Sequence, residues 1–160
     1  VYQGQAPDGD GIASDPPEDE VMHSWRDYAV EFRVRIIQSS TSQNLFDTWI
    51  TLRQGSTSQT QACESLNNFY LNVRSHTSLI SANDNCQYVP LGQTTYPFKL
   101  NTWYTVRVEA IDEHLTLLID GQPILERDDA MIGQGFYYLN VAPNAIVQFD
   151  DIFVERYNPS

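Results

Sequence analysis

Aromatic, amide and guanidinium side chains alternate with apolar residues in three segments of the chain, 47–54, 69–74 and 136–141. Alternate residues of a β-strand point to opposite faces of a sheet. With the apolar residues facing a core, the other face carries Trp49, Arg53, Tyr70, Asn72, Arg74, Tyr138 and Asn140. Aromatic rings stack on sugar rings and planar polar groups bond sugar hydroxyls, so this set suits sugar binding. The same residue types are also common on any exposed sheet face, through β-propensity and cross-strand pairing.

The sequence lacks the motifs of common hydrolytic and phosphate-binding sites. It contains neither a G-x-S-x-G nucleophile motif nor a P-loop. Glycoside hydrolysis needs two carboxylates flanking the scissile bond, and a strand aligns such a pair at alternate positions. The acids at 18–20 are contiguous, whereas Glu126, Asp128 and Asp129 lie where a predicted hairpin strand ends. We therefore expect a binding domain rather than an enzyme.

The sequence holds two cysteines, Cys63 and Cys86, and both lie in polar segments rich in turn-forming residues. A disulfide between them would close a loop of about 23 residues, worth about 3 kcal/mol on the chain-entropy estimate. Two free thiols are the alternative. A structural zinc site is disfavoured, because His76 is the only further ligand nearby. A disulfide would place the protein outside the cytosol.

Apolar and polar residues alternate along most of the chain, which is the period of a half-buried strand. The alternation is clearest at 28–37 and 103–110. Further strands are predicted at 47–54, 68–75, 78–82, 87–90, 115–119, 123–126, 135–141 and 146–155, with a tight hairpin turn at Asp120–Gly121. The only helical structure expected is one turn at 128–132. About ten short strands with turns between them predict an antiparallel sandwich or barrel.

Negative charge is concentrated at the start of the chain. The formal net charge is −12, from 21 Asp and Glu against 9 Lys and Arg in 160 residues. Residues 1–20 hold six of these acids, no Lys or Arg, and several prolines and glycines. We therefore expect an irregular acidic arm at 1–20 and one β-sandwich domain at 21–160. So few bases disfavour nucleic acid and anionic membranes as partners, and no apolar run reaches the roughly 20 residues of a membrane helix.

Three stretches resemble one known family of sandwich domains. They are WRDYAVEFRVRI (25–36), YPFKLNTWYTVRVEAIDEHLTLLIDGQPI (96–124) and GFYYLNVAPNAIVQFDDIFVERY (135–157). Together they resemble the concanavalin A-like lectin/glucanase superfamily, with laminin-G-like domains and the 3-keto-disaccharide hydrolase-like domains of secreted bacterial proteins as nearest relatives. The resemblance covers roughly residues 25–157. It implies an all-β, antiparallel two-sheet jelly roll, often with sugar bound on its concave sheet or at the rim.

The resemblance supports a hypothesis about the function of the three alternating segments. It implies that 47–54, 69–74 and 136–141 are strands of the concave sheet, where their outward side chains would form one ligand-binding patch. We expect an extracellular or cell-surface, non-catalytic domain of a larger protein that binds a carbohydrate or a cell-surface glycan. A laminin-G-like structural or protein-interaction module is the first alternative, and a glycoside hydrolase on the same fold is the second.

Calcium is the ion that the resemblance brings into consideration. Family members that bind Ca²⁺ often use an aspartate of the final strand together with groups near the N-terminus. Asp150 and Asp151 match that strand position, and Glu18, Asp19 and Glu20 are the candidate partners. Ca²⁺ takes six to eight oxygen ligands, which carboxylates supply. Solvated acids without an ion are the alternative, and the expected function requires no cofactor.

Overall fold

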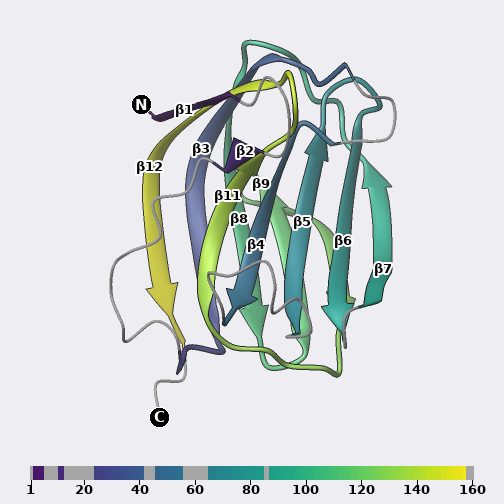
Figure 1. Ribbon diagram of the computed structural model, residues 1–160, viewed down its shortest axis with the longest axis vertical. Coiled ribbons are helices and arrows are strands. Elements are labelled where there is room, and N and C mark those ends of the chain that lie inside the picture. Colours follow the sequence, from purple (N-terminus) through teal and green to yellow (C-terminus); the bar gives the residue numbers. More distant parts are fainter. Residues whose placement is uncertain are drawn as a thin grey trace.

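The computed structural model describes residues 2–5, 11–12, 24–41, 46–55, 65–84 and 87–157. These residues form two antiparallel sheets of six strands each. One sheet has the strand order β1-β12-β3-β8-β9-β10 and the other has the order β2-β11-β4-β5-β6-β7. The two sheets pack as two layers of a sandwich (Figure 1). The fold is therefore the jelly-roll β-sandwich that the sequence predicts.

The strands are short and follow one another through turns and loops. Their bounds are β1 Tyr2–Gln5, β2 Gly11–Ile12, β3 Tyr28–Gln38, β4 Thr48–Gln54, β5 Leu66–Asn72, β6 Thr77–Asp84, β7 Gln87–Thr95, β8 Trp103–Ile111, β9 His114–Ile119, β10 Gln122–Asp128, β11 Phe136–Val141 and β12 Ile146–Arg156. Within the described part of the chain, no helix is long and apolar enough to cross a membrane.

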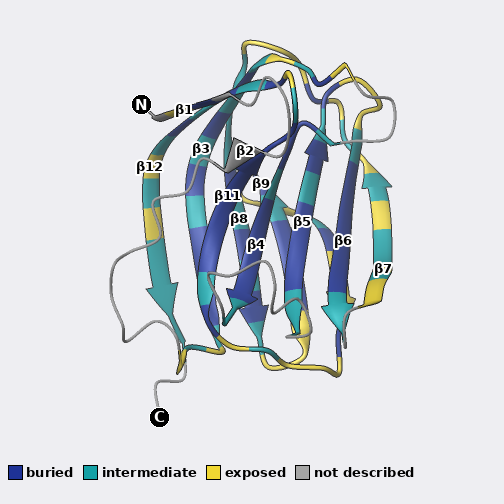
Figure 2. Ribbon diagram, viewed as in Figure 1, coloured by how far each residue is buried: buried dark blue, intermediate teal, exposed yellow. Residues whose placement is uncertain are grey.

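Strands β3 and β8 show how alternation builds the core. Val30 pairs with Val108 across these strands, and both side chains are fully buried. Buried and intermediate residues alternate along β3 (Figure 2). Phe32 meets Phe149 of β12 edge to face, with 5.8 Å between the ring centroids. Burying such a side chain is worth about 1.5–3 kcal/mol, so the two apolar faces hold the sheets together.

The hairpin turn at Asp120–Gly121 forms where it is predicted. Asp120 and Gly121 have φ values of 50° and 83°, as the two central residues of a type I′ turn require. The carboxylate of Asp120 accepts the N–H of Thr105 at 2.9 Å, and its own N–H donates to the Thr105 carbonyl at 2.8 Å. The turn is thereby fastened to β8 as well as joining β9 to β10.

Two local predictions are wrong. Strand β7 continues to Thr95 instead of ending at 90. Its pairing with β6 shifts where Ile80 opposes Gly92 and Ser81 opposes Pro90, so the strand passes its proline with one extra residue at the sheet edge. Residues 129–132 form no helical turn. The carboxylate of Asp129 there accepts the N–H of Met131 at 3.1 Å.

Two strands come from the segment that the sequence predicts as an arm. β1 pairs with β12 at the edge of one sheet, and β2 pairs with β11 at the edge of the other (Figure 1). The segment at 1–20 thus contributes backbone pairing to both layers. A domain boundary at residue 20 stays a prediction.

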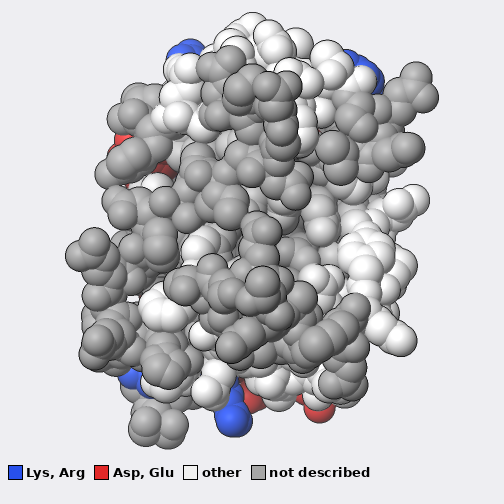
Figure 3. Space-filling view, in the orientation of Figure 1, with Lys and Arg blue, Asp and Glu red and all other residues white. Residues whose placement is uncertain are grey.

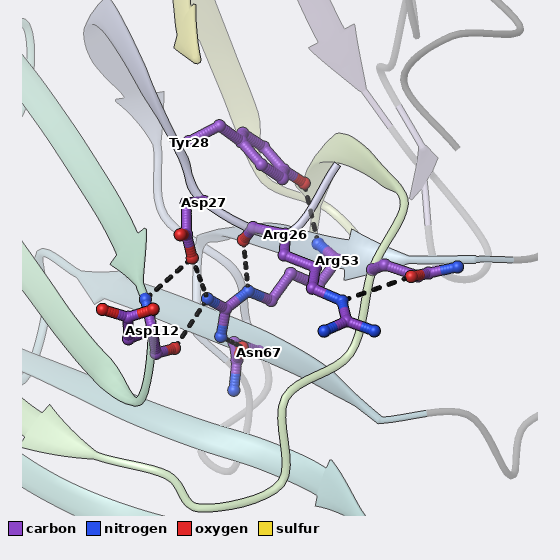
Figure 4. A network of polar contacts seen from close by, with 7 residues as sticks. Arg26, Asp27, Tyr28, Arg53, Asn67 and Asp112 are labelled. Carbon is purple, nitrogen blue, oxygen red and sulfur yellow. Dashed lines mark hydrogen bonds and ion pairs between the residues drawn. The ribbon is translucent and has the colours of Figure 1, made fainter. Parts of the chain in front are cut away.

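Arg53, near the end of β4, is fully buried at the junction of the two sheets. Its Nε donates to the carbonyl of Arg26 at 2.7 Å, and its Nη2 donates to the carbonyl of Asp112 at 2.8 Å. Nη2 also lies 3.5 Å from Oδ1 of Asp27, and Nη1 lies 3.5 Å from Oδ1 of Asn67 (Figure 4). Burial lowers the pKa of Arg53, and the charge of Asp27 opposes that shift. The charge is therefore paired and hydrogen-bonded, as a buried guanidinium must be.

A β-bulge explains why Arg53 points inward. Tyr138 of β11 pairs with Thr51, whereas Phe136 pairs with Gln54, so β4 is one residue longer than β11 over this stretch. Arg53 has a φ of 64°, in the left-handed region. The extra residue interrupts the alternation of the strand. The prediction that Arg53 projects outward with the sugar-binding set is therefore wrong.

The hydroxyl of Tyr28 extends this network to a third strand. It accepts the backbone N–H of Arg53 at 2.8 Å (Figure 4). It also donates to the carbonyl of Gly135 at 2.9 Å. Burial raises the pKa of Tyr28 well above its ordinary value, so the hydroxyl stays protonated and remains a donor. The first residue of β3 thus ties the end of β4 to the start of β11.

Replacing Arg53 tests the network. Arg53→Ala leaves the half-buried carboxylate of Asp27 without its charge partner, and breaking a buried pair in this way costs about 3–5 kcal/mol of unfolding free energy. Urea denaturation measures the loss. Arg74→Ala, in an exposed turn, is the matched control and is expected to stay within about 0.5 kcal/mol of the parent. An Arg53→Ala protein as stable as this control would contradict the account.

Candidate functional site

The β2-β11-β4-β5-β6-β7 sheet has one surface that is turned away from the core, and we call this surface the outer face. The register of the strands places on it Tyr138 and Asn140 of β11, Trp49 and Thr51 of β4, Leu66, Asn68, Tyr70 and Asn72 of β5, Thr77, Leu79, Ser81 and Asn83 of β6, and Tyr88, Pro90, Gln93 and Thr95 of β7. Aromatic rings, amides and hydroxyls predominate, and none of these described positions holds an acid, a base or a histidine.

Three aromatic rings form a continuous run on the outer face. Trp49 pairs with Tyr70 across β4 and β5, and their rings stack at 27° with 5.8 Å between centroids. Phe46, just before β4, lies 4.9 Å from the ring of Tyr70. Burial raises the pKa of Tyr70, which keeps its hydroxyl neutral. The run therefore offers apolar ring surface next to an uncharged hydroxyl.

A chain of hydrogen bonds crosses three strands beside this run. Nδ2 of Asn140 donates to Oγ1 of Thr51 at 3.1 Å, and that hydroxyl donates to Oδ1 of Asn68 at 2.7 Å. Nδ2 of Asn140 also lies 3.1 Å from the carbonyl of Trp49. The chain fixes the three side chains in one orientation. The neighbouring hydroxyl of Tyr138 is buried and has no hydrogen-bond partner among the described residues.

Access to the outer face differs between its two sides. On β11 and the middle of β4, Tyr138, Asn140 and Thr51 are buried (Figure 2). Trp49 and Tyr70 are half-buried and Gln93 is exposed on the edge strand β7. Between them, Leu79 and Ser81 of β6 are buried. The accessible part of the outer face therefore consists of the Trp49–Tyr70 stack and the exposed side chains of β7, and we call it the accessible strip.

The structure brings together most of the residues that the sequence predicts. Asn140, Trp49 and Tyr70 are direct neighbours in one cross-strand row. Tyr138 occupies the next row, opposite Thr51, and Asn72 lies half-buried at the end of β5.

Two predicted residues are not part of this surface. Arg53 is buried in the network described above. Arg74 does not lie in a strand, because β5 ends at Asn72, whose side chain accepts the N–H of Ser75 at 2.9 Å and begins a turn. The predicted strand at 68–75 is thus too long by three residues, and Arg74 projects from the turn into solvent.

Sequence reasoning missed the contribution of β6 and β7. Leu79 and Gln93 continue the row of Trp49 and Tyr70, and Thr77 and Thr95 continue the row of Asn72. Residues 91–95, LGQTT, show no apolar–polar alternation, and the proline before them predicts the end of the strand. The apolar pattern therefore gives no signal for this half of β7.

Charged side chains gather on the opposite sheet. Arg107 of β8 pairs with Glu109 and Glu155 at 2.8 Å each and lies 4.0 Å from Glu31. The hydrogen bonds with these carboxylates raise the pKa of Arg107 against the effect of burial and lower the pKa of Glu155. In a view onto the outer face, the visible described charges lie around the rim (Figure 3).

Trp103 on that opposite sheet is engaged by two arginines. The guanidinium carbons of Arg33 and Arg35 each lie 4.8 Å from the centroid of its ring. Nε of Arg35 donates to Oε1 of Gln148 at 2.9 Å. These contacts hold the ring in cation–π pairs, so we assign Trp103 a packing role.

Two carboxyl groups meet at the end of β6. Burial raises the pKa of Asp84, and the facing carboxyl of Asp129, with which it hydrogen-bonds, raises it further, whereas a hydrogen bond with Ser65 lowers it. Asp129 is buried and accepts Nδ2 of Asn67 at 3.0 Å. Asp84 has the alternation of the core face, so it does not belong to the outer face.

The calcium ligands and the disulfide remain predictions. Glu18, Asp19 and Glu20, like Cys63 and Cys86, lie outside the described residues. Asp150 and Asp151 are described, and the Asp151 carboxylate lies 3.8 Å from the guanidinium of Arg33. Among the residues that the structure describes, no group of three or more His, Cys, Asp or Glu is placed to hold a metal.

The two-sheet topology is that of an antiparallel jelly-roll β-sandwich, and solved structures share this fold. A carbohydrate-binding module, CBM66 from Bacillus subtilis, is similar over 96% of this chain and 85% of its own, with a TM-score of 0.69 and 16% sequence identity. A Bacillus licheniformis β-glucanase is similar over 97% of this chain and 77% of its own (TM-score 0.66, 9% identity). The Caenorhabditis elegans galectin LEC-6 is similar over 95% of this chain and 96% of its own (TM-score 0.60, 8% identity).

These likenesses establish the fold, which the sequence resemblance also implies, and at such identities they establish the fold alone. No family model matches the sequence, and no curated protein matches it. The function must therefore be argued from the side chains of this chain.

From the Asp84–Asp129 pair we can predict how the free energy of unfolding changes with pH. A carboxyl whose pKa is raised on folding binds its proton more tightly in the folded protein, so its stabilising contribution is present in acid and fades as pH rises through the raised pKa. Asp84→Asn removes the repulsion and keeps a donor to Asp129.

We therefore expect Asp84→Asn to be more stable than the parent at pH 7 and to lose that advantage as pH falls toward 4. Urea denaturation at both pH values measures it, with Glu113→Gln, an exposed acid, as control. An advantage that is equal at the two pH values would contradict the coupling.

Proposed function

We propose that the chain is a carbohydrate-binding domain that binds a neutral glycan on the accessible strip. One observation carries the proposal: a chain with a net charge of −12 presents a sheet face made of aromatic, amide and hydroxyl groups without an ionisable acid or base among the described positions. Neutral sugars offer apolar ring faces and hydroxyl groups, which this composition complements. The same fold in a carbohydrate-binding module and a galectin supports this choice.

The geometry suggests how a sugar would bind. The Trp49–Tyr70 stack presents ring surface for the apolar face of a pyranose. Asn72 beside it and Gln93 across β6 supply amide donors and acceptors for hydroxyls. Adjacent strands lie about 4.8 Å apart, so a ligand reaching from β4 to β7 crosses about 14 Å. That distance favours an oligosaccharide over a single sugar.

The distribution of carboxylates supports binding without catalysis. A retaining glycosidase holds two carboxyl groups about 5–5.5 Å apart across the bond that it cleaves, and an inverting enzyme holds them farther apart. The outer face has no carboxylate among its described positions, and Asp84 has the alternation of the core face. The likeness to a β-glucanase is thus one of fold.

We further propose that the domain acts outside the cell or at its surface, as part of a larger protein. Polysaccharides and cell-surface glycans are the polymers that such a strip would meet there. The cysteine pair, which suits an oxidising compartment, supports this assignment.

The aromatic stack gives the direct test of the proposal. Trp49→Ala or Tyr70→Ala removes ring surface from the accessible strip, and each is expected to weaken glycan binding about tenfold. A glycan array identifies the best neutral ligand, and calorimetry with that ligand measures the affinity.

Phe153→Ala is the matched control, because Phe153 is 54% exposed on the outer surface of the opposite sheet. It should leave the affinity unchanged. An array without glycan binding, together with capture of a specific protein partner, would instead favour the laminin-G-like alternative. Polysaccharide turnover that is lost in Asp84→Asn would favour the hydrolase.

The thiols test the proposed location. In protein secreted from its host, Cys63 and Cys86 should resist alkylation without reductant and take up two labels after reduction, as intact mass reports. Quantitative labelling of both thiols before reduction would argue against an extracellular disulfide.

A further inference from the structure

A separate polar pocket of about 490 Å³ opens at one end of the sandwich. Its walls come from the segment before β3, the β8–β9 turn, the segment before β11 and the end of β12. The residues that line it include Arg26, Asp112, Gln134, Arg156 and Tyr157. Pockets for small ligands span about 300–1,000 Å³, so the space suits one sugar ring. The pocket shares no lining residue with the accessible strip.

Two guanidinium groups of this pocket have no acidic partner within the described part of the chain. Arg156 lies with its guanidinium carbon 5.0 Å from the centroid of the Trp25 ring, and Nε of Arg26 makes one long hydrogen bond, of 3.4 Å, to Gln134. Among the described residues, neither group is paired with a carboxylate. In a chain with 21 acids and 9 bases, two unpaired arginines in one pocket point to an anionic ligand.

The acids of the same pocket narrow the choice of anion. Asp27 is occupied, because its Oδ1 accepts the N–H of Asp112 at 2.8 Å and faces the buried guanidinium of Arg53 (Figure 4). Asp112 itself is exposed at the pocket wall. Its carboxylate repels a bare anion or a polyanion but accepts hydroxyl groups. The pocket therefore combines donors for a carboxylate with acceptors for hydroxyls.

The walls are held in place before any ligand arrives. The carbonyl of Asp112 accepts Nη2 of Arg53 at 2.8 Å, and the carbonyl of Asp27 accepts the N–H of Tyr157 at 2.8 Å. The N–H of Gly135, next to Gln134, donates to the carbonyl of Trp25 at 3.0 Å. All four segments of the pocket are thus joined by hydrogen bonds, which lowers the entropy cost of binding.

We propose that this pocket is a second ligand site that binds a carboxylate-bearing sugar, a uronic acid. Arg26 and Arg156 bind the carboxylate, for which the planar guanidinium has matching bidentate geometry. Asp112 and Gln134 bind the ring hydroxyls. The domain would then bind a neutral glycan on its sheet and an acidic sugar at its end.

Titration of the folded chain with D-glucuronate, D-glucose and acetate, followed by NMR, tests the site. D-glucuronate is expected to bind saturably, and D-glucose and acetate are not expected to bind at the same concentrations. Arg26→Gln and Arg156→Gln should each weaken glucuronate binding about tenfold, as the loss of a charge-assisted hydrogen bond does. Arg74→Gln, an exposed arginine elsewhere, and Trp49→Ala should leave it unchanged.

The outcomes separate this inference from the neutral-glycan proposal. Glucuronate binding that survives Trp49→Ala supports the pocket whether or not the sheet binds a neutral glycan. If Arg156→Gln disturbs the fold through its contact with Trp25, Arg26→Gln decides the question by itself. Among the described residues, the side chain of Arg26 makes only the long bond to Gln134, and its carbonyl, which accepts Nε of Arg53, is unchanged in the variant. Acetate binding as tightly as glucuronate, no glucuronate binding, or unchanged affinity in Arg26→Gln would overturn the proposal.

Discussion

The buried positive charge of Arg53 is the constraint on which one end of this sandwich depends. Removing a guanidinium from water costs several kcal/mol unless carboxylates and carbonyls replace the water. Here the replacements come from the segment before β3, from β5 and from the β8–β9 turn, so both sheets and their connections must meet around one side chain (Figure 4). The bulge in β4 and the left-handed conformation of Arg53 are the backbone consequences. The same contacts hold Asp27 and Asp112 in the wall of the end pocket, so the network that closes the fold also shapes a site.

Away from that end, the molecule keeps its charges and its neutral polar groups on different surfaces. Arg107 and its three carboxylate neighbours lie on the outer surface of one sheet, together with the two arginines that flank Trp103. The other sheet presents the Trp49–Tyr70 stack among amides and hydroxyls. A net charge of −12 therefore says little about the proposed glycan surface. It is the local composition of each surface that distinguishes a strip for neutral sugar from a pocket for an acidic one.

Alternation was enough to predict an antiparallel sandwich or barrel and to tell which side chains of each strand point outward, because side chains of an unbroken strand follow a strict period of two. The family resemblance added the two-sheet jelly roll and one shared sheet face for Trp49, Tyr70 and Asn140. Alternation failed where the period is broken. The bulge turned Arg53 inward, and the side chain of Asn72 ended β5 before Arg74. Neither the bulge in β4 nor the early end of β5 can be recognised from the pattern of apolar residues. The end pocket was beyond prediction for another reason: Arg26, Asp112 and Arg156 come from segments far apart in the sequence and meet only through the folded topology.

The central claim is that a neutral glycan lies across the outer face of the β4–β7 strands. Assigned ¹H–¹⁵N spectra recorded during titration with a neutral oligosaccharide test it most directly. The account predicts that the largest shifts occur at the indole N–H of Trp49, the backbone of Tyr70 and the side-chain amides of Asn72 and Gln93. The opposite sheet, around Arg107, should not change. Shifts centred on that opposite sheet, or confined to the end pocket around Arg26 and Arg156, would contradict it.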